Sequence, residues 1–211
     1  NAMPADGIHV SMETISEAMG RRLSEAHMST GREYISAPVF GRPDSAAAGK
    51  LFVVAAGAAS AIERCQPAFD VMGQRTFVVG SEPVAANVVK ITGNFMIASV
   101  IETLSEGFAL SRKYDIDPAQ LLEVLTNTLF SAPVYKNYGA MIAEERYEPA
   151  GFKLNLGLKD ISLALEAADA KGVTMPIANV VRDQFLTGIK RGYEDLDWGA
   201  LGRVAADDAG F

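Results

Sequence analysis

The pattern of apolar and polar residues divides the chain into two parts with different periods. In the first part short apolar runs alternate with amphipathic segments, which is typical of strands alternating with helices in an α/β layer. The predicted strands cover residues 8–10, 33–39, 51–55 and 76–79, and the predicted helices cover residues 16–26 and 60–72. From Pro83 onward the period is helical. We therefore expect an α/β domain over residues 3–82 and an all-helical domain over residues 83–211.

Helix-starting residues punctuate the second part. Pro83 opens a long apolar helix that runs to about Arg112, because Pro suits the first position of a helix. Further helices are expected at residues 119–125 after the N-cap Asp117, at residues 158–171, from Pro176, and at Trp198 after the N-cap Asp197. The second part should therefore be a helical domain built around one long helix.

Two polar residues interrupt the long apolar helix. Lys90 and Asn94 stand four residues apart, so helical periodicity places both on one face. Apolar residues occur nearly all round this helix, which predicts that its middle is buried. A buried Lys is either paired or has a lowered pKa, and such a Lys is a usable general acid/base. On the spacing alone, a Lys whose stem packs and whose ammonium reaches water is the simpler interpretation.

Composition and charge restrict the partners. The 211 residues are 49% hydrophobic, enough for a substantial core, and carry a net charge of −7 without a basic cluster. Nucleic acids and anionic membranes require Lys/Arg patches, so neither is expected as a partner. No apolar run approaches the ~20 residues of a membrane span. A small-molecule ligand is therefore expected.

Cysteine and histidine usage gives no metal site. Cys65 is the only cysteine, which excludes an internal disulfide and a cysteine-built zinc or iron–sulfur site and favours a reducing cytoplasm. His9 and His27 are far apart in the sequence, so they are interpreted as ordinary surface or core residues. Asn1 and Ala2 ahead of Met3 resemble the remnant of a cleaved tag.

The first part contains about half of a dinucleotide-binding domain. Such a domain has six strands, and four are predicted here. Its phosphate-binding turn, Gly-x-Gly-x-x-Gly, follows the first strand, but this sequence contains no Gly-x-Gly. Either a cofactor-binding half is missing from this sequence, or the fold is a different one.

Four segments, in order, resemble the β-hydroxyacid dehydrogenase family. They are Val10-Ser-Met-Glu-Thr-Ile-Ser16, Ala37-Pro-Val-Phe-Gly-Arg42 with the Gly-Lys-Leu strand start beyond it, Lys90-x-x-x-Asn94, and Phe152 with Lys159-Asp160. The family includes 3-hydroxyisobutyrate dehydrogenases and glyoxylate/succinic semialdehyde reductases, and its NAD-binding part is similar to that of 6-phosphogluconate dehydrogenase. The resemblance implies the C-terminal half of a Rossmann-like domain, followed by the helical domain.

The resemblance also implies roles for individual residues. Lys90 falls at the family's catalytic Lys and Asn94 at its substrate-binding Asn. The remaining matches are Phe40, Gly41 and Arg42 in the substrate loop, and Thr14, Phe152 and Lys159 at positions that contact the nicotinamide cofactor. The loop departs from the family's Ser-Gly-Gly, since Phe40 removes a hydroxyl donor. Arg42 either grips a substrate carboxylate with its planar guanidinium or is simply solvated.

These matches imply an NAD(P)-dependent oxidoreductase. It would transfer a hydride between nicotinamide and a small 2- or 3-hydroxyacid or its semialdehyde, with Lys90 as general acid/base. Because the first βαβ unit is missing, on the order of 80 residues by the size of a half-domain, we expect a truncated form that binds NAD or NADP weakly. The long apolar helix predicts a homodimer.

Two other functions remain open. The chain can be a non-catalytic helical dimerisation fragment that folds through its long helix without transferring hydride. It can also belong to an imine or other carbonyl reductase on the same fold, which the Phe40 substitution favours.

Overall fold

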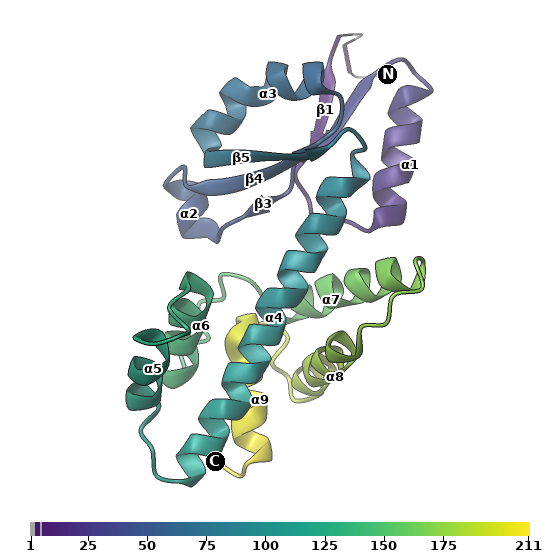
Figure 1. The fold of residues 1–211 in the computed structure, drawn as a ribbon. Helices are drawn as coiled ribbons and strands as arrows, with labels where there is room; N and C mark the ends of the chain where they lie inside the picture. The colour runs from purple at the N-terminus through teal and green to yellow at the C-terminus, as the bar shows by residue number, and fades with distance from the viewer. Residues whose placement is uncertain (1–2, 5) are drawn as a thin grey trace. The chain divides into compact units, whose positions relative to one another are not determined.

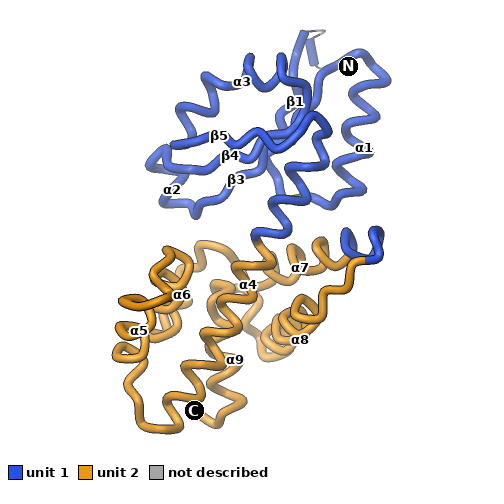
Figure 2. Tube along the Cα trace, viewed as in Figure 1, with its two compact units in different colours: residues 1–93, 166–172 blue, residues 94–165, 173–211 orange. Residues whose placement is uncertain are grey.

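The structure is a computed structural model that describes residues 3–4 and 6–211, so the tag-like residues Asn1 and Ala2 lie outside the described part. The chain divides into two compact units (Figure 2). Unit 1 comprises residues 1–93 and 166–172, and unit 2 comprises residues 94–165 and 173–211. Each unit is described by itself below.

Unit 1 is an α/β layer, as predicted (Figure 1). Its strands are β1 (Ile8–Ser11), β2 (Glu33–Ser36), β3 (Val39–Phe40), β4 (Leu51–Ala56) and β5 (Gly73–Gly80). Its helices are α1 (Glu17–Met28), α2 (Pro43–Ala47), α3 (Ala59–Met72) and the first part of α4 (Val84–Lys113). β1 pairs parallel with β2, and β4 pairs parallel with β5 through the crossover helix α3. The core of unit 1 includes Ile35 and Val53 of the sheet and Phe69 of α3.

The predicted strand over residues 33–39 is two strands. Pro38 has no N–H to donate to a neighbouring strand, and its carbonyl accepts instead from Val54 N at 2.9 Å. The chain turns there, and both pieces pair antiparallel with β4. The short helix α2 was not predicted, although Pro43 at its start was a readable signal.

Unit 2 is built from helices only, within the described residues. It contains the second part of α4, then α5 (Pro118–Thr126), α6 (Pro133–Ala143), α7 (Leu154–Asp169, apart from its last turn), α8 (Pro176–Lys190), a short 3₁₀ turn (Trp198–Ala200) and α9 (Leu201–Asp208). The predicted caps are confirmed, since Asp117 accepts from Ala119 N and Asp197 accepts from Gly199 N. Helix α6 was not predicted, and the last short helix predicted at Trp198 is the 3₁₀ turn followed directly by α9.

The core of unit 2 includes one buried polar contact between large aromatic side chains. Trp198 Nε1 donates to the Tyr138 hydroxyl at 2.8 Å, and both residues are buried. The N–H is thereby satisfied without water, as a buried indole requires. Phe108 and Phe185 pack in the same cluster. This core holds α4, α6 and α8 together.

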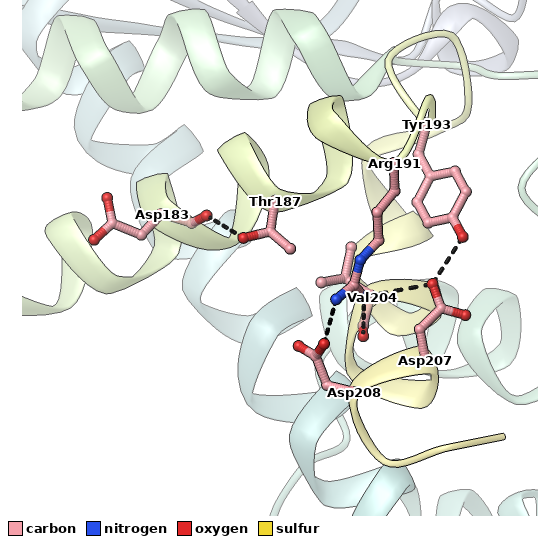
Figure 3. A network of polar contacts seen from close by, with 7 residues as sticks. All are labelled: Asp183, Thr187, Arg191, Tyr193, Val204, Asp207 and Asp208. Atoms are coloured by element: carbon pink, nitrogen blue, oxygen red, sulfur yellow. Dashed lines mark hydrogen bonds and ion pairs between the residues drawn. The ribbon is translucent and has the colours of Figure 1, made fainter.

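Helix α9 is tied to the end of α8 by a polar network (Figure 3). Arg191, at the C-cap of α8, donates to Val204 O at 3.0 Å and forms ion pairs with Asp207 and Asp208. The Tyr193 hydroxyl donates to Asp207 Oδ2 at 2.7 Å. The guanidinium therefore neutralises two carboxylates at the C-terminal end of α9, where the helix dipole disfavours negative charge.

Helix α4, with 30 residues, is longer than the other helices of the described chain. By length and composition alone it meets the criterion for a membrane span, with a mean hydropathy of 1.5 over its most apolar 18 residues. From the sequence, no apolar run of membrane-spanning length was expected, so this segment differs from the prediction. In unit 2, however, Ala98, Ile101, Leu104 and Phe108 of this helix are buried against other helices. A core helix passes the same test, so the criterion is weak evidence of a membrane.

Candidate active site

Lys90 lies in α4, and its ammonium faces an aromatic ring within unit 1. The Nζ atom is 4.4 Å from the centroid of the Phe40 ring, a cation–π contact. The sequence predicted that the middle of this helix is buried, but Lys90 is only partly buried. The neighbouring side chains of Val88 and Val89 are also exposed, by 38% and 39%. This part of α4 therefore packs against the sheet with one face, and its other face is not covered by the described residues of unit 1.

The substrate loop predicted from the sequence leaves β3 and enters α2. Phe40 ends β3, and Gly41 has φ +139°, a conformation that L side chains rarely adopt. A Cβ at Gly41 would also lie 2.6 Å from Leu51 Cδ2. Arg42 is the N-cap of α2, makes no side-chain cap bond there, and is partly buried. The loop therefore has a fixed backbone that presents Phe40 and Arg42.

Thr14 follows the carboxyl end of β1 and is partly buried. The N-cap of the following helix α1 is Ser16, whose hydroxyl accepts from Met19 N at 3.0 Å. Ligands of open α/β sheets bind outside the carboxyl ends of parallel strands, which is where Thr14 lies.

Asn94 and Lys159 meet at one carboxylate in unit 2. Asn94 is buried, and its Nδ2 donates to Asp160 Oδ2 at 2.5 Å. Lys159 Nζ lies 2.9 Å from the other oxygen, Oδ1, as an ion pair that lacks hydrogen-bond geometry. The side chain of Asp160 is fully buried and that of Lys159 is 44% exposed. Asp160 thus joins two residues that the sequence selected separately.

Phe152 is packed as part of the core of unit 2. Its ring centroid lies 4.7 Å from that of Trp198 in an edge-to-face contact. Its backbone N–H donates to Asp197 Oδ2 at 3.2 Å. A structural role accounts for these contacts, and the proposed contact with a cofactor stays a prediction.

Asp160 was not among the site residues predicted from the sequence. It appeared there only in the Lys159-Asp160 match to the family. Its signal was legible in the helical period of α7, in which Gly157, Ile161 and Ala164 form the buried stripe and Asp160 falls on it. An acid on an apolar stripe is rarely buried without a partner.

The two histidines lie side by side, although they are far apart in the sequence. His9 Nδ1 and His27 Nε2 are 3.0 Å apart, and both rings contact Tyr34. Burial, and secondarily the nearby His27, lower the pKa of His9. Over the described part of the chain, no group of three or more His, Cys, Asp or Glu side chains is placed to hold a metal ion.

An apolar cavity of about 490 Å³ adjoins the Phe40 ring in unit 1. Its walls are apolar side chains of the sheet and of α4, namely Phe40, Phe52, Val54, Phe77, Val79 and Val89. Space on this side of Phe40 means that packing does not enclose the ring fully.

Two family models match the chain in succession. The model of the NAD-binding domain of 6-phosphogluconate dehydrogenase matches residues 1–80. The model of the NAD-binding part of NADP-dependent 3-hydroxyisobutyrate dehydrogenase matches residues 85–205. Together these matches span nearly all of both parts predicted from the sequence.

Similar proteins agree with the family models. The chain is 45% identical to the uncharacterized oxidoreductase YfjR of Bacillus subtilis, over 93% of this chain and 68% of the relative. It is 31% identical to glyoxylate/succinic semialdehyde reductase 1 of Arabidopsis thaliana, over 92% of this chain and 66% of that enzyme. A structure of Mycobacterium tuberculosis 3-hydroxyisobutyrate dehydrogenase with L-serine has a TM-score of 0.85 and 25% identity, covering 96% of this chain and 70% of that one. The chain spans about two thirds of the length of these curated relatives.

Proposed function

Because this chain belongs to the β-hydroxyacid dehydrogenase family, we propose that it carries the catalytic groups of an NAD(P)-dependent oxidoreductase. The reaction transfers a hydride between nicotinamide and a small 2- or 3-hydroxyacid or its semialdehyde. The observation that carries this proposal is the polar pair on α4. Lys90 and Asn94 lie one turn apart on an uninterrupted helix, and Asn94 is held by the buried Asp160.

Lys90 is the proposed proton-transfer group. Oxidation of a hydroxyl needs an acceptor for its proton, and reduction of a carbonyl needs a donor to the developing alkoxide. An amine/ammonium pair serves both directions. The partial exposure of Lys90 supports this role, since a group that exchanges a proton with substrate has to be reached from outside the unit.

Asn94 and Arg42 are the proposed substrate-binding groups. An amide can donate to and accept from a substrate oxygen, so Asn94 can orient the oxygen that exchanges a proton with Lys90. The Arg42 guanidinium suits bidentate recognition of a carboxylate. Gly41 lets the loop backbone turn between Phe40 and Arg42.

The cofactor is NAD or NADP, in keeping with both family models. Three residues of this chain would hold it, and their chemistry fits an anionic dinucleotide with a flat amide-bearing ring. The half-exposed ammonium of Lys159 suits a phosphate or ribose oxygen, and the Thr14 hydroxyl lies at the carboxyl end of a parallel strand. Phe152 is the third. The bound nicotinamide supplies or accepts the hydride.

We propose that tight cofactor binding needs a preceding half-domain. A Gly-x-Gly-x-x-Gly turn binds the pyrophosphate at a helix N-terminus, and the 211 residues contain no Gly-x-Gly. In the proposals below, "the extended protein" means this chain preceded by a nucleotide-binding half-domain that carries that turn. We further propose that the protein works in the cytoplasm as a homodimer.

The substrate class is proposed from the relatives and from the loop. The Arabidopsis relative is named as a reductase of glyoxylate and succinic semialdehyde, which supports a small carboxylate-bearing carbonyl compound. A second candidate, a cyclic imine or another carbonyl compound without a carboxylate, is favoured by one observation, the absence of a hydroxyl donor at Phe40.

Steady-state assays of the extended protein test the proposal. Glyoxylate, succinic semialdehyde, 3-hydroxyisobutyrate and a cyclic imine are supplied with NADH, NADPH or the oxidised forms, and nicotinamide absorbance is followed. We expect turnover of at least one hydroxyacid or semialdehyde and none of the imine. Turnover of the imine alone would replace the leading proposal by the second, and no turnover with any substrate would contradict both.

A further inference from the structure

Phe40 and Lys90 form a contact that the sequence did not predict. The ring and the ammonium come from different elements of unit 1, β3 and α4, and Nζ lies 4.4 Å from the ring centroid. The face of an aromatic ring is negative, so it attracts an ammonium. From the sequence, Phe40 was predicted as a residue of the substrate loop that lacks the hydroxyl donor of the family.

Gly93 leaves room for this ring. A Cβ added at Gly93 would lie 2.4 Å from Phe40 Cζ and 2.5 Å from Cε1, far inside normal contact distance. The same helix carries a second glycine, Gly107, where an added Cβ meets nothing within 4 Å. The helix therefore has one glycine that the ring requires and one that it does not.

Packing alone does not account for the position of the ring. Phe40 is only partly buried, and the apolar cavity of about 490 Å³ opens beside it. An aromatic side chain next to that much space gains less from burial than a core residue does. On the α4 side the ring packs against the apolar cluster that includes Ala86, and it also approaches Gly93 and the Lys90 ammonium.

We propose that Phe40 is a positioning residue that acts through Lys90. Its ring holds the ammonium over one face by a cation–π contact, at a place that Gly93 keeps free of side-chain atoms. Phe40 then has no direct part in the reaction, and its hydrocarbon surface binds no polar group of the substrate. The consequence for catalysis rests on the proposed function of Lys90, whereas the contact itself does not.

The contact is tested on this 211-residue chain without cofactor or substrate. The Nζ and Cε nuclear magnetic resonance signals of Lys90, assigned by their absence in Lys90→Gln, are followed against pH. The ring favours the charged form, so Phe40→Leu should lower the midpoint of the Lys90 titration by about 0.5–1.5 pH units. The matched control is Phe52→Leu, because Phe52 lies opposite Phe40 in the β3–β4 register, lines the same cavity, and has its ring contact with Phe77.

A second pair of variants keeps the test valid if Phe40→Leu folds poorly. Gly93→Ala must displace the ring and should shift the Lys90 titration in the same direction, while Gly107→Ala should leave it unchanged. Circular dichroism establishes that each variant is folded. A Lys90 titration within 0.2 pH units of wild type in both Phe40→Leu and Gly93→Ala would overturn the proposal. An equal shift in Phe52→Leu would do the same.

Kinetics of the extended protein then separate this proposal from the proposed function. If Lys90 transfers the proton, Phe40→Leu should move the pH profile of kcat to lower pH, with a smaller effect on KM. If Lys90→Ala left kcat unchanged while Phe40→Leu still moved the titration, the proposed function would fail and the contact would stand. If Phe40→Leu left the Lys90 titration unmoved while Lys90→Ala abolished turnover, the proposed contact would fail and the proposed function would stand.

Discussion

The side-chain amide of Asn94 donates a 2.5 Å hydrogen bond to Oδ2 of Asp160, a carboxylate without solvent exposure. Only the nitrogen of an amide can donate to an ionised carboxylate, so this contact decides which way the amide is turned. The carbonyl oxygen of Asn94 is thereby turned away from Asp160. A residue proposed to orient substrate is itself oriented by a group that lies inside the protein.

We predict that Asp160→Ala lowers both stability and turnover. The change leaves the buried Asn94 amide without its acceptor, which should cost about 1–3 kcal/mol of unfolding free energy. In the extended protein kcat/KM should fall about tenfold or more, because the amide is free to rotate. Denaturant unfolding and steady-state kinetics measure the two effects.

Asp195→Asn is the matched control for this change. Asp195 forms an exposed ion pair with Lys153, and exposed pairs contribute about 0–1 kcal/mol. A fall in stability in the control equal to that in Asp160→Ala would contradict the special role of the buried carboxylate.

Lys90→Ala in the extended protein should lower kcat by about 10²–10⁴-fold while the fold survives, because a proton-transfer group typically contributes that factor. Lys90→Arg should fail almost as badly, since a guanidinium does not release its proton near neutral pH. Stopped-flow measurement of nicotinamide absorbance gives kcat for each. Retention of more than about a tenth of wild-type kcat by Lys90→Ala would mean that the lysine is structural.

Glu102 predicts a dependence of stability on pH. It lies in α4, is 6% exposed, and its Oε2 is buried without a hydrogen-bond partner. Burial, followed by the nearby carboxylates of Glu106 and Asp208, raises its pKa from 4.5 to about 7. The carboxylate of Asp208 belongs to the network of Figure 3, where it pairs with Arg191.

A pKa raised by folding means that the native state holds this proton more tightly than the unfolded chain. Its stabilising contribution is therefore complete below pH 4.5 and is lost as the pH rises through about 7, by about 3 kcal/mol in total. Glu102→Gln resembles the protonated acid and should flatten the loss of stability between pH 5 and 8, measured by urea unfolding. Glu123→Gln, an exposed site on α5, should leave the pH dependence as in wild type, and an unchanged pH dependence in Glu102→Gln would be evidence against a raised pKa.

Cofactor affinity should differ between this chain and the extended protein. Without a pyrophosphate-binding turn, we expect residues 3–211 to bind NADH or NADPH at least a hundredfold more weakly, which corresponds to about 2.7 kcal/mol. Isothermal titration calorimetry on both proteins measures the difference. Equal affinities would show that the 211 residues already hold the dinucleotide.

We predict a homodimer in which α4 takes part, because unit 2 has apolar side chains that are exposed. Leu110 and Tyr114 are 63% and 74% exposed, beside an apolar cavity of about 410 Å³ between α4, α5 and α6. Light scattering at micromolar concentration should give twice the chain mass, and Leu110→Glu should shift it toward the monomer. Leu156→Glu, at another exposed leucine, is the control, and a monodisperse wild-type monomer would refute the prediction.

The sequence predicted those parts of the fold whose signals are local. The alternation of strands and helices ahead of Pro83 and the N-caps Asp117 and Asp197 need only neighbouring residues, and both were confirmed. The division of residues 33–39 into two strands was not predicted, because it depends on a pairing with β4 some fifteen residues later. Helix α6 was missed although Pro133 at its start is the same kind of signal that predicted α8 from Pro176.

The candidate site was predictable residue by residue but not in its contacts. Lys90 and Asn94 stand out as polar positions in an apolar helix. The partners that hold them, Phe40 and Asp160, lie 50 and 66 residues away and are brought close only by the fold. For the same reason the contact between His9 and His27 could not be predicted from local sequence patterns.

The close approach of Gly93 to Phe40 couples the substitutions that these two positions can accept. While position 40 carries an aromatic ring, every side chain at 93 collides with it. A lineage that replaces the ring by a small residue is freed to place a side chain at 93, and afterwards cannot regain the ring in one step. Libraries that seek new substrates by varying position 40 should therefore vary 93 in the same clones, because the order in which the two changes arrive decides which of them survive.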